Sequence, residues 1–294
     1  MIITAIILLL LLIISAMVWY AYRQSAAIAG SKVKKFPLTV FPDQFKVPFE
    51  NVIFKNKEGL TLKGWFIPAA QPSSKTIIFM HGWGMNKGSV LPYTVFLRDE
   101  GFNLFYFDFR GYGDSQEGIT SVGYHEIKDA EAAIEVLKTT RPEAAQEIAL
   151  YGISMGAAVA VYEAAHNDNV KALVAEGCYY SYDKVVLRWA KQHRSAPNFP
   201  LVPLALFFTR RRLGLDPEAF SPRHNITKLK GKPIFIINGS DDTLAPRHDA
   251  RKLFRRAGEP KQLWIVANAH HTTSAEVAGQ QYKNRLAEFY KKYL

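Results

Sequence analysis

The chain has 294 residues, of which 48% are hydrophobic and 21% charged, and its formal net charge is +11. This composition excludes an intrinsically disordered chain and suits one large α/β domain. The only cysteine, Cys178, excludes an intramolecular disulfide. The positive charge favours an anionic surface as partner. Because no Lys/Arg run is interleaved with aromatic residues, we expect a membrane surface and no nucleic acid.

The first segment of the chain, Ile2–Tyr22, contains no charged side chain. At about 1.5 Å per residue, a helix of this length crosses a hydrocarbon core of about 30 Å. Trp19 and Tyr20, together with Tyr22, are the aromatic residues expected at a membrane interface. We therefore predict a single-pass transmembrane anchor over residues 1–23.

Two alternatives to the anchor remain: a cleaved signal peptide and a buried soluble helix. Residues 27–29 read AIA before Gly30, which is a cleavage-like site. However, no Lys or Arg precedes the apolar run, and the run is longer than a usual signal core. The nearby basic residues all follow the run, which favours a cytoplasmic catalytic domain over an exported one. These residues are Arg23, Lys32, Lys34 and Lys35.

After a linker and entry segment over residues 24–50, short apolar runs alternate with helical patterns. The predicted strands are Leu60–Pro68, Thr76–Met80, Asn103–Phe107, Ile148–Tyr151, Val170–Ala175, Pro233–Asn238 and Gln262–Val266. The predicted helices are Ser89–Glu100, Ser121–Thr140, Ala157–Ala165, Arg247–Ala257 and Ala275–Tyr290. The first strand is expected to be antiparallel. The later alternation predicts an α/β fold with a mostly parallel central sheet flanked by helices.

One interval, about 178–230, shows no strand pattern within the domain predicted over residues 51–294. An insertion of this size after a sheet strand is expected to form a helical cap over the strand ends. The cap contains the apolar stretch Phe199–Phe208, followed by Arg210–Arg212. We expect this stretch either to pack on the core or to enter an anionic membrane surface and admit a lipid-like ester.

The candidate nucleophile lies in the pentapeptide GISMG, residues 152–156, which matches the pattern G-x-S-x-G. A predicted strand precedes the pentapeptide and a helix rich in small residues follows it. This strand–turn–helix context predicts a nucleophile elbow that exposes the Ser154 hydroxyl above the sheet. The alternative is an incidental helix start capped by Ser154.

A serine hydroxyl needs a base to accept its proton and an acid to orient the base. In proteins with a nucleophile elbow of this kind, the acid follows the serine in the sequence and the histidine comes last. Asp241 and Asp242 follow the strand that ends at Asn238, and His270 and His271 precede the last helix. Position alone allows either aspartate to be the acid and either histidine to be the base.

The oxyanion of a tetrahedral intermediate needs backbone N–H donors. We expect one donor to be the N–H of Met155, directly after the nucleophile. The loop after the strand Thr76–Met80 reads HGWG, and the N–H of Trp83 is the second candidate. We expect His81, in the same loop, to be a structural hydrogen-bonding residue rather than the base.

These motifs, in this order, resemble those of the α/β-hydrolase family, particularly its N-terminally membrane-anchored serine hydrolases. The resemblance covers about Asn51 to Leu294. Residues 108–115, DFRGYGDS, are similar to the family's D-x-R-G-x-G-x-S loop. Residues 239–246, GSDDTLAP, resemble G-x-x-D-x-x-V-P, and residues 266–271, VANAHH, resemble V-P-G-A-G-H. The chain departs from these patterns at Ala245, Ala267, Asn268 and His270.

The resemblance implies that Ser154, Asp242 and His271 are the nucleophile, acid and base, and that Asp108 and Arg110 are structural. Glu176, at a strand end, is expected to be structural or close to the substrate. The implied reaction is hydrolysis of an ester or thioester through an acyl-enzyme, with no cofactor or metal. The alternatives are a serine peptidase or amidase of the same fold and a non-catalytic membrane-bound binding protein.

Overall fold

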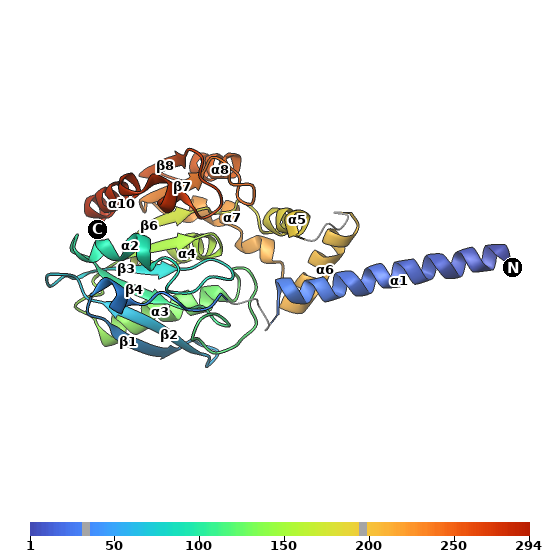
Figure 1. The fold of residues 1–294 in the computed structure, drawn as a ribbon, viewed down its shortest axis with the longest axis horizontal. Coiled ribbons are helices and arrows are strands. Elements are labelled where there is room, and N and C mark those ends of the chain that lie inside the picture. The colour runs from blue at the N-terminus through green and yellow to red at the C-terminus, as the bar shows by residue number, and fades with distance from the viewer. Residues whose placement is uncertain (31–35, 194–198) are drawn as a thin grey trace.

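The central sheet is built from apolar segments, most of them buried on both faces. The computed structural model describes residues 1–30, 36–193 and 199–294, and within these ranges eight strands form one sheet (Figure 1). Lys32, Lys34 and Lys35 lie outside the described residues. The strand order is β1-β2-β4-β3-β5-β6-β7-β8. The strands are β1 (Glu50–Lys55), β2 (Thr61–Ile67), β3 (Lys75–Met80), β4 (Asn103–Phe107), β5 (Glu147–Ile153), β6 (Val170–Glu176), β7 (Ile234–Gly239) and β8 (Lys261–Val266).

The direction of the strands gathers the sequence motifs at one edge of the sheet. Strand β2 runs antiparallel to both β1 and β4, whereas the pairs from β4 through β8 are parallel. The carboxyl ends of parallel strands meet at the same edge. The loops after β3, β5, β7 and β8 therefore converge, and these loops carry the candidate site residues.

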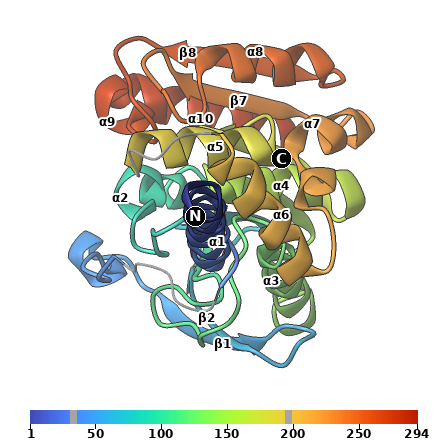
Figure 2. The ribbon, with the colours of Figure 1, turned by 90° about the vertical axis from the view of Figure 1, so that its right-hand side faces the viewer.

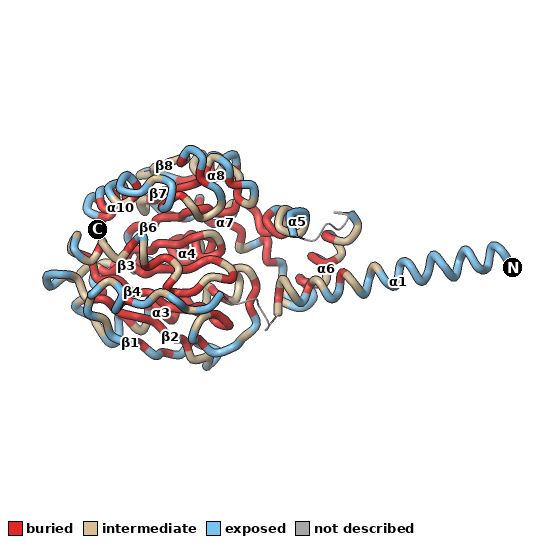
Figure 3. The backbone as a smooth tube through the Cα atoms, viewed as in Figure 1, coloured by how far each residue is buried: buried red, intermediate tan, exposed pale blue. Residues whose placement is uncertain are grey.

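Helices cover both faces of the sheet, and two hydrophobic cores result. One core lies between the sheet and α3 (Glu126–Thr140), α4 (Met155–His166) and α8 (Arg247–Arg256). The other lies under α2 (Leu91–Thr94), α9 (Ser274–Ala278) and α10 (Gln280–Tyr293). Figure 3 shows that the central strands and α4 are largely buried, whereas exposed residues lie on the outer turns of α8 and α10. This three-layer arrangement is the predicted α/β fold.

The described residues between β6 and β7 form helices and loops above the carboxyl edge of the sheet. These helices are α5 (Tyr182–His193), α6 (Leu201–Leu213), η3 (Pro217–Phe220), α7 (Pro222–Asn225) and η4 (Ile226–Lys228). Two of the three arginines of α6 are engaged within the molecule: Arg210 pairs with Asp183 at 2.7 Å, and Arg212 contacts α1. Arg211 is exposed.

Helix α1 (Ile2–Ile28) projects from the domain and is exposed along most of its length (Figures 1 and 3). Among the described residues it is the one helix long and apolar enough to cross a membrane, a property that signal sequences share. The helix continues to Ile28, so the first residues of the expected linker 24–50 are helical. Its last turns pack against α6, and the view along α1 shows α5 and α6 beside it (Figure 2).

Several predicted boundaries were wrong for local reasons. The edge strand β1 was missed because its apolar run, residues 52–54, is too short to indicate a strand. The helix predicted from Ser121 begins at Glu126, because the Glu126 carboxylate accepts hydrogen bonds from the N–H groups of Ser121 and Gly123 and so fixes a turn. The last predicted helix is divided into α9 and α10 at Gly279, whose φ is +51°.

Two other differences concern short helical segments. The helix predicted over Ser89–Glu100 is two short segments, α2 and η2 (Val95–Arg98). A further short segment, η1 (Pro42–Phe45), lies in the entry region. These differences leave the topology unchanged.

Candidate active site

Ser154 lies on the turn between β5 and α4, in a backbone conformation that is rare for a residue other than glycine. Its φ is +54° and its ψ is −114°. The turn is tight because a Cβ on Gly152 would lie 2.3 Å from the carbonyl oxygen of Gly156. A Cβ on Gly156 would lie 2.1 Å from the carbonyl oxygen of Met80 on β3. Glycine is therefore required at both positions, and strain of this kind is typical of functional turns.

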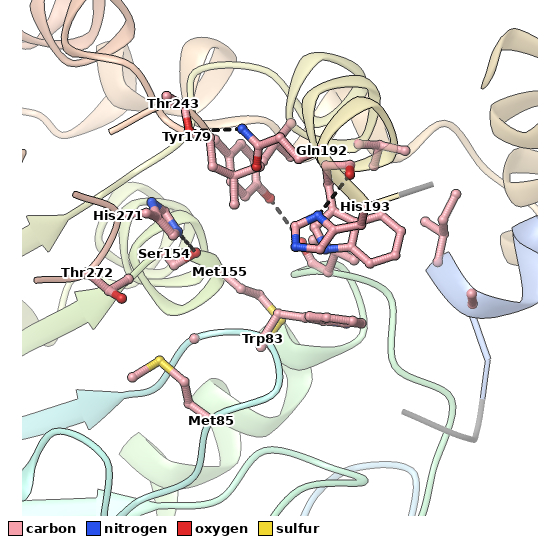
Figure 4. Close-up of a pocket in the computed structure, with 18 of the residues that line it drawn as sticks. Trp83, Met85, Ser154, Met155, Tyr179, Gln192, His193, Thr243, His271 and Thr272 are labelled. Atoms are coloured by element: carbon pink, nitrogen blue, oxygen red, sulfur yellow. Dashed lines mark hydrogen bonds between the residues drawn. The ribbon is translucent and has the colours of Figure 1, made fainter. Parts of the chain in front are cut away.

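A chain of short hydrogen bonds joins Ser154, His271 and Asp242, and Figure 4 shows the bond between Ser154 and His271. The distance from Ser154 Oγ to His271 Nε2 is 2.8 Å, and that from His271 Nδ1 to Asp242 Oδ2 is 2.7 Å. A carboxylate only accepts, so Nδ1 carries the proton and Nε2 accepts from the serine hydroxyl. The tautomer is thus the one in which Nε2 can act as a base.

The Asp242 carboxylate is held from its other side by backbone donors. Its Oδ1 accepts hydrogen bonds from the N–H groups of Leu244 at 2.9 Å and Ala245 at 2.7 Å. Its side chain is fully buried, whereas that of His271 is 23% exposed. The acid therefore has a fixed orientation, and the imidazole remains accessible from the cavity.

The neighbouring acid and histidine point elsewhere. Asp241 is exposed, and its carboxylate accepts from the Ser240 hydroxyl at 2.8 Å. His270 is also exposed, and its backbone N–H donates to Thr273 Oγ1. The structure thus brings Asp242 and His271 to Ser154, and leaves the second member of each pair outside the site.

Two backbone N–H groups beside Ser154 are candidates for an oxyanion hole. Met155 is the first residue of α4, so its N–H has no acceptor within the helix. Within the described residues, the backbone N–H of Trp83 has no protein acceptor either. The Trp83 loop approaches the serine closely, because a Cβ on Gly82 would lie 3.3 Å from Ser154 Cβ. Both residues line the same cavity as Ser154.

His81 supports this loop with both ring nitrogens. The backbone N–H of Phe109 donates to Nε2 at 3.1 Å, so Nδ1 carries the proton and donates to the carbonyl of Gly82 at 2.8 Å. Complete burial lowers the pKa of the imidazole and keeps it neutral. His81 is thus a hydrogen-bonding residue of the loop, away from the Ser154 hydroxyl.

Asp108 and Arg110, in the loop of residues 108–115, form ion pairs with residues outside the loop and do not line the cavity. Asp108 forms a buried ion pair with Lys87 at 2.6 Å. Arg110 forms a buried ion pair with Asp129 at 2.8 Å. These contacts connect the loop to α3 and to the segment after β3, which is a structural role.

Glu176, at the end of β6, contributes to the site through its backbone. Its carbonyl oxygen accepts from the Ser154 N–H at 2.8 Å. Its buried carboxyl group accepts from the hydroxyls of Tyr151 at 2.7 Å and Tyr282 at 2.6 Å. Burial raises the pKa of this carboxyl group. Glu176 therefore fixes the turn that carries the serine.

Ser154 and His271 open onto a cavity of about 390 Å³. Figure 4 shows the serine, the histidine and Trp83 around this space. Most of the remaining wall is apolar, including Val185, Val186 and Trp189 of α5, and Ala27 and Ile28 of α1. Sequence analysis missed these residues, because the contacts of α5 and α1 with the site depend on tertiary packing. The size is typical of a small-molecule site.

The residues that the structure describes give no support for a metal site or a reactive thiol. Among the described residues, no cluster of three or more His, Cys, Asp or Glu side chains could hold a metal ion. Cys178 is buried, and burial raises the pKa of its thiol, which disfavours the reactive thiolate. The sequence-based expectation of no cofactor or metal stays a prediction.

The strand order and the Ser–His–Asp arrangement at the carboxyl edge define the class of α/β hydrolases. A protein-family model described as serine aminopeptidase, S33, matches residues 71–213. The chain is 30% identical over 233 residues to the uncharacterised protein YqkD of Bacillus subtilis, a match that covers 79% of this chain and 75% of that protein. The chain belongs to the α/β-hydrolase family.

Solved structures agree with this assignment. The structure of an esterase from Pyrococcus furiosus matches with a TM-score of 0.74 and 27% identity, over 88% of this chain and 98% of that chain. An acylaminoacyl peptidase from Pyrococcus horikoshii matches with a TM-score of 0.64 and 18% identity, over 87% of this chain and 44% of that chain. The second likeness shows the fold alone. The family and the esterase structure support a hydrolase.

Proposed function

We propose that the protein is a serine hydrolase that cleaves carboxylic ester or thioester bonds through an acyl-enzyme on Ser154. The observation that carries the proposal is the hydrogen-bonded chain from Ser154 through His271 to Asp242 at the wall of the cavity. A strained serine, an oriented imidazole and a buried acid together form a catalytic unit for acyl transfer.

The geometry supports a two-step reaction. In the first step, Ser154 Oγ attacks the ester carbonyl while His271 Nε2 accepts its proton, and the N–H groups of Met155 and Trp83 stabilise the oxyanion. The C–O or C–S bond breaks, and the leaving alcohol or thiol takes the proton from His271. In the second step, His271 accepts a proton from water, which attacks the acyl carbonyl. The bond between the acyl group and Ser154 Oγ then breaks, His271 returns the proton to Oγ, and the acid is released.

An ester is favoured over a peptide by the wall of the cavity. None of its described lining residues is an aspartate or glutamate. An aminopeptidase must bind the ammonium group of its substrate, for which an acidic partner is expected. A peptidase nevertheless remains the second candidate, because the matching family model is described as a serine aminopeptidase.

We propose that α1 anchors the protein in a membrane as a single pass, with the catalytic domain on the cytoplasmic side and with a lipid-like ester as substrate. The apolar length of α1 supports the anchor. The apolar cavity supports an apolar substrate. The basic residues that follow the apolar part of α1 favour the cytoplasmic side.

The first test is labelling of the full-length protein with a fluorophosphonate, which reacts with activated serines. We expect the wild type and a Ser73→Ala control to be labelled and a Ser154→Ala variant to remain unlabelled. Ser73 lies in the loop before β3, outside the cavity lining. Absence of labelling of folded wild type, or equal labelling of Ser154→Ala, would refute the proposed nucleophile. A panel of acyl esters and aminoacyl amides then separates the two candidate activities.

A further inference from the structure

A second apolar space lies next to the active-site cavity, between α1, α5 and α6. Its free volume is about 40 Å³, enough for about three water molecules. The surface that its walls expose is apolar. We call this space the anchor groove. Its described lining residues are Tyr20, Gln24, Ile28, Val186, Trp189, Ala190, Leu201, Val202 and Ala205.

One face of α1 forms a whole side of the anchor groove. Tyr20, Gln24 and Ile28 are spaced four residues apart, so they lie on the same face of the helix. At about 1.5 Å per residue, this stripe extends along the helix for about 12 Å. The groove is therefore elongated in the direction of the predicted membrane span.

The inner end of the anchor groove meets the active-site cavity. Ile28, Val186 and Trp189 line both spaces. Only side chains separate the two spaces at this point, so joining them requires a change of rotamer rather than of chain connectivity. The serine and the groove thus lie on opposite sides of one apolar partition.

The outer end of the anchor groove lies where aromatic residues gather. Tyr22 of α1 packs edge-on against Phe208 of α6, with ring centroids 5.5 Å apart. Phe207 and Trp19 are exposed at 53% and 60%. Exposed aromatic residues beside an apolar helix are typical of the membrane interface. The Tyr20 end of the groove therefore lies beside the part of α1 that would meet the lipid headgroups.

Helix α1 is fixed as a wall of the groove by polar contacts as well as by packing. Arg212 Nε donates to Ser25 Oγ at 2.7 Å, and the Arg212 guanidinium lies 4.3 Å from the centroid of the Tyr22 ring. The backbone of Gly30 pairs with that of Thr120. These contacts hold the last turns of α1 against the cap, in a place that a freely tethered anchor would not keep.

We propose that the side chains of the partition turn aside and that the anchor groove widens to admit the hydrocarbon chain of a membrane-resident acyl ester. The carbonyl of the ester would lie at Ser154, and its acyl chain would pass Ile28 and follow α1 back to the bilayer. This inference rests on the proposed ester hydrolysis and names its substrate class as long-chain lipid esters. In this arrangement α1 is part of the substrate-binding site.

The test compares a long-chain with a short-chain ester, using the full-length protein in phosphatidylcholine nanodiscs. The substrates are monooleoylglycerol, whose chain needs the groove, and 4-nitrophenyl acetate, which fits the cavity alone. Ala205→Phe on α6 and Ala190→Phe on α5 place a ring in the groove from opposite sides. Ala219→Phe, at an exposed position of η3, is the matched control.

We expect both groove variants to lower the ratio of kcat/KM for the long ester to that for the short ester at least tenfold. The control should keep the wild-type ratio. The inference is overturned if both groove variants keep the wild-type ratio, lose both activities in equal proportion, or if wild type hydrolyses only the short ester. If wild type hydrolyses neither ester and resists the fluorophosphonate, the proposed function fails as well.

Discussion

Position in the sequence alone left both residues open in the pairs 241/242 and 270/271, and the family resemblance favoured Asp242 and His271. Backbone geometry brings these two side chains to Ser154. The loop that carries His271 contains Asn268 and Thr272, whose φ angles are +59° and +65°. These turns decide which of two adjacent side chains faces Ser154, and no sequence spacing encodes that choice. Ser154 itself could be predicted, because its strained turn requires the glycines at positions 152 and 156.

A first prediction at the residue scale concerns the Asp242 carboxylate. Asp242→Asn should lower kcat for ester hydrolysis by about 10³ to 10⁴, because an amide no longer selects the imidazole tautomer with a free Nε2. Asp241→Asn, one residue away and exposed, should stay near wild-type activity. Steady-state kinetics of both variants provide the measurement. Equal losses in the two would mean that Asp242 has no special role.

At the scale of elements, burial and pattern explain which predictions were correct. Strands β3 to β7 are continuous apolar runs, so their positions and the parallel sheet could be predicted. Helix ends were less predictable because they depend on local contacts, such as those of the Glu126 carboxylate. Helix α4 could be predicted from its small residues. The burial of its ionisable residue Glu163 could not be predicted in the same way, because it depends on tertiary packing.

Burial raises the pKa of the Glu163 carboxyl group to about 7, from 4.5. In the unfolded chain this group loses its proton near pH 4.5, whereas the folded protein keeps it until about pH 7. The free energy of unfolding should therefore fall as pH rises through this window and then stay level. Glu163→Gln removes this dependence on pH. As pH rises, the free energy of unfolding of the variant should therefore exceed that of wild type by a growing amount, up to about 3 kcal/mol.

Thermal unfolding midpoints of wild type and Glu163→Gln between pH 4.5 and pH 8 test this prediction. The exposed Glu143→Gln is the matched control and should follow the wild-type curve. A constant difference between Glu163→Gln and wild type across the pH range would contradict the assignment of the titration to Glu163.

At the scale of the whole molecule, composition predicted an apolar N-terminal helix. It did not predict that the end of this helix lines the active-site cavity. The contacts of α1 with α5 and α6 join residues more than 150 positions apart, such as Ser25 and Arg212. No periodicity in either segment reveals them. The same distance in sequence explains why the lining of the cavity could be known only from the folded chain.

The orientation of the whole molecule can be tested by thiol labelling, since Cys178 is buried. An Ala219→Cys variant places an accessible thiol on the cap. With the catalytic domain in the cytoplasm, a membrane-impermeant maleimide should label this variant only after permeabilisation, and should leave wild type unlabelled throughout. Labelling in intact cells would place the domain outside. An N-terminal tag retained on the mature protein would exclude cleavage of α1.

The contact between the end of α1 and the cavity has a consequence for how the enzyme would meet its substrate. Ala27 and Ile28 of α1 are part of the cavity wall. If α1 spans a bilayer, the active site therefore stays next to the membrane surface and cannot move away on a flexible linker. Its search would be confined to two dimensions. Turnover would then follow the mole fraction of substrate among the surrounding lipids, and dilution of the membranes in more buffer would leave the rate per enzyme unchanged.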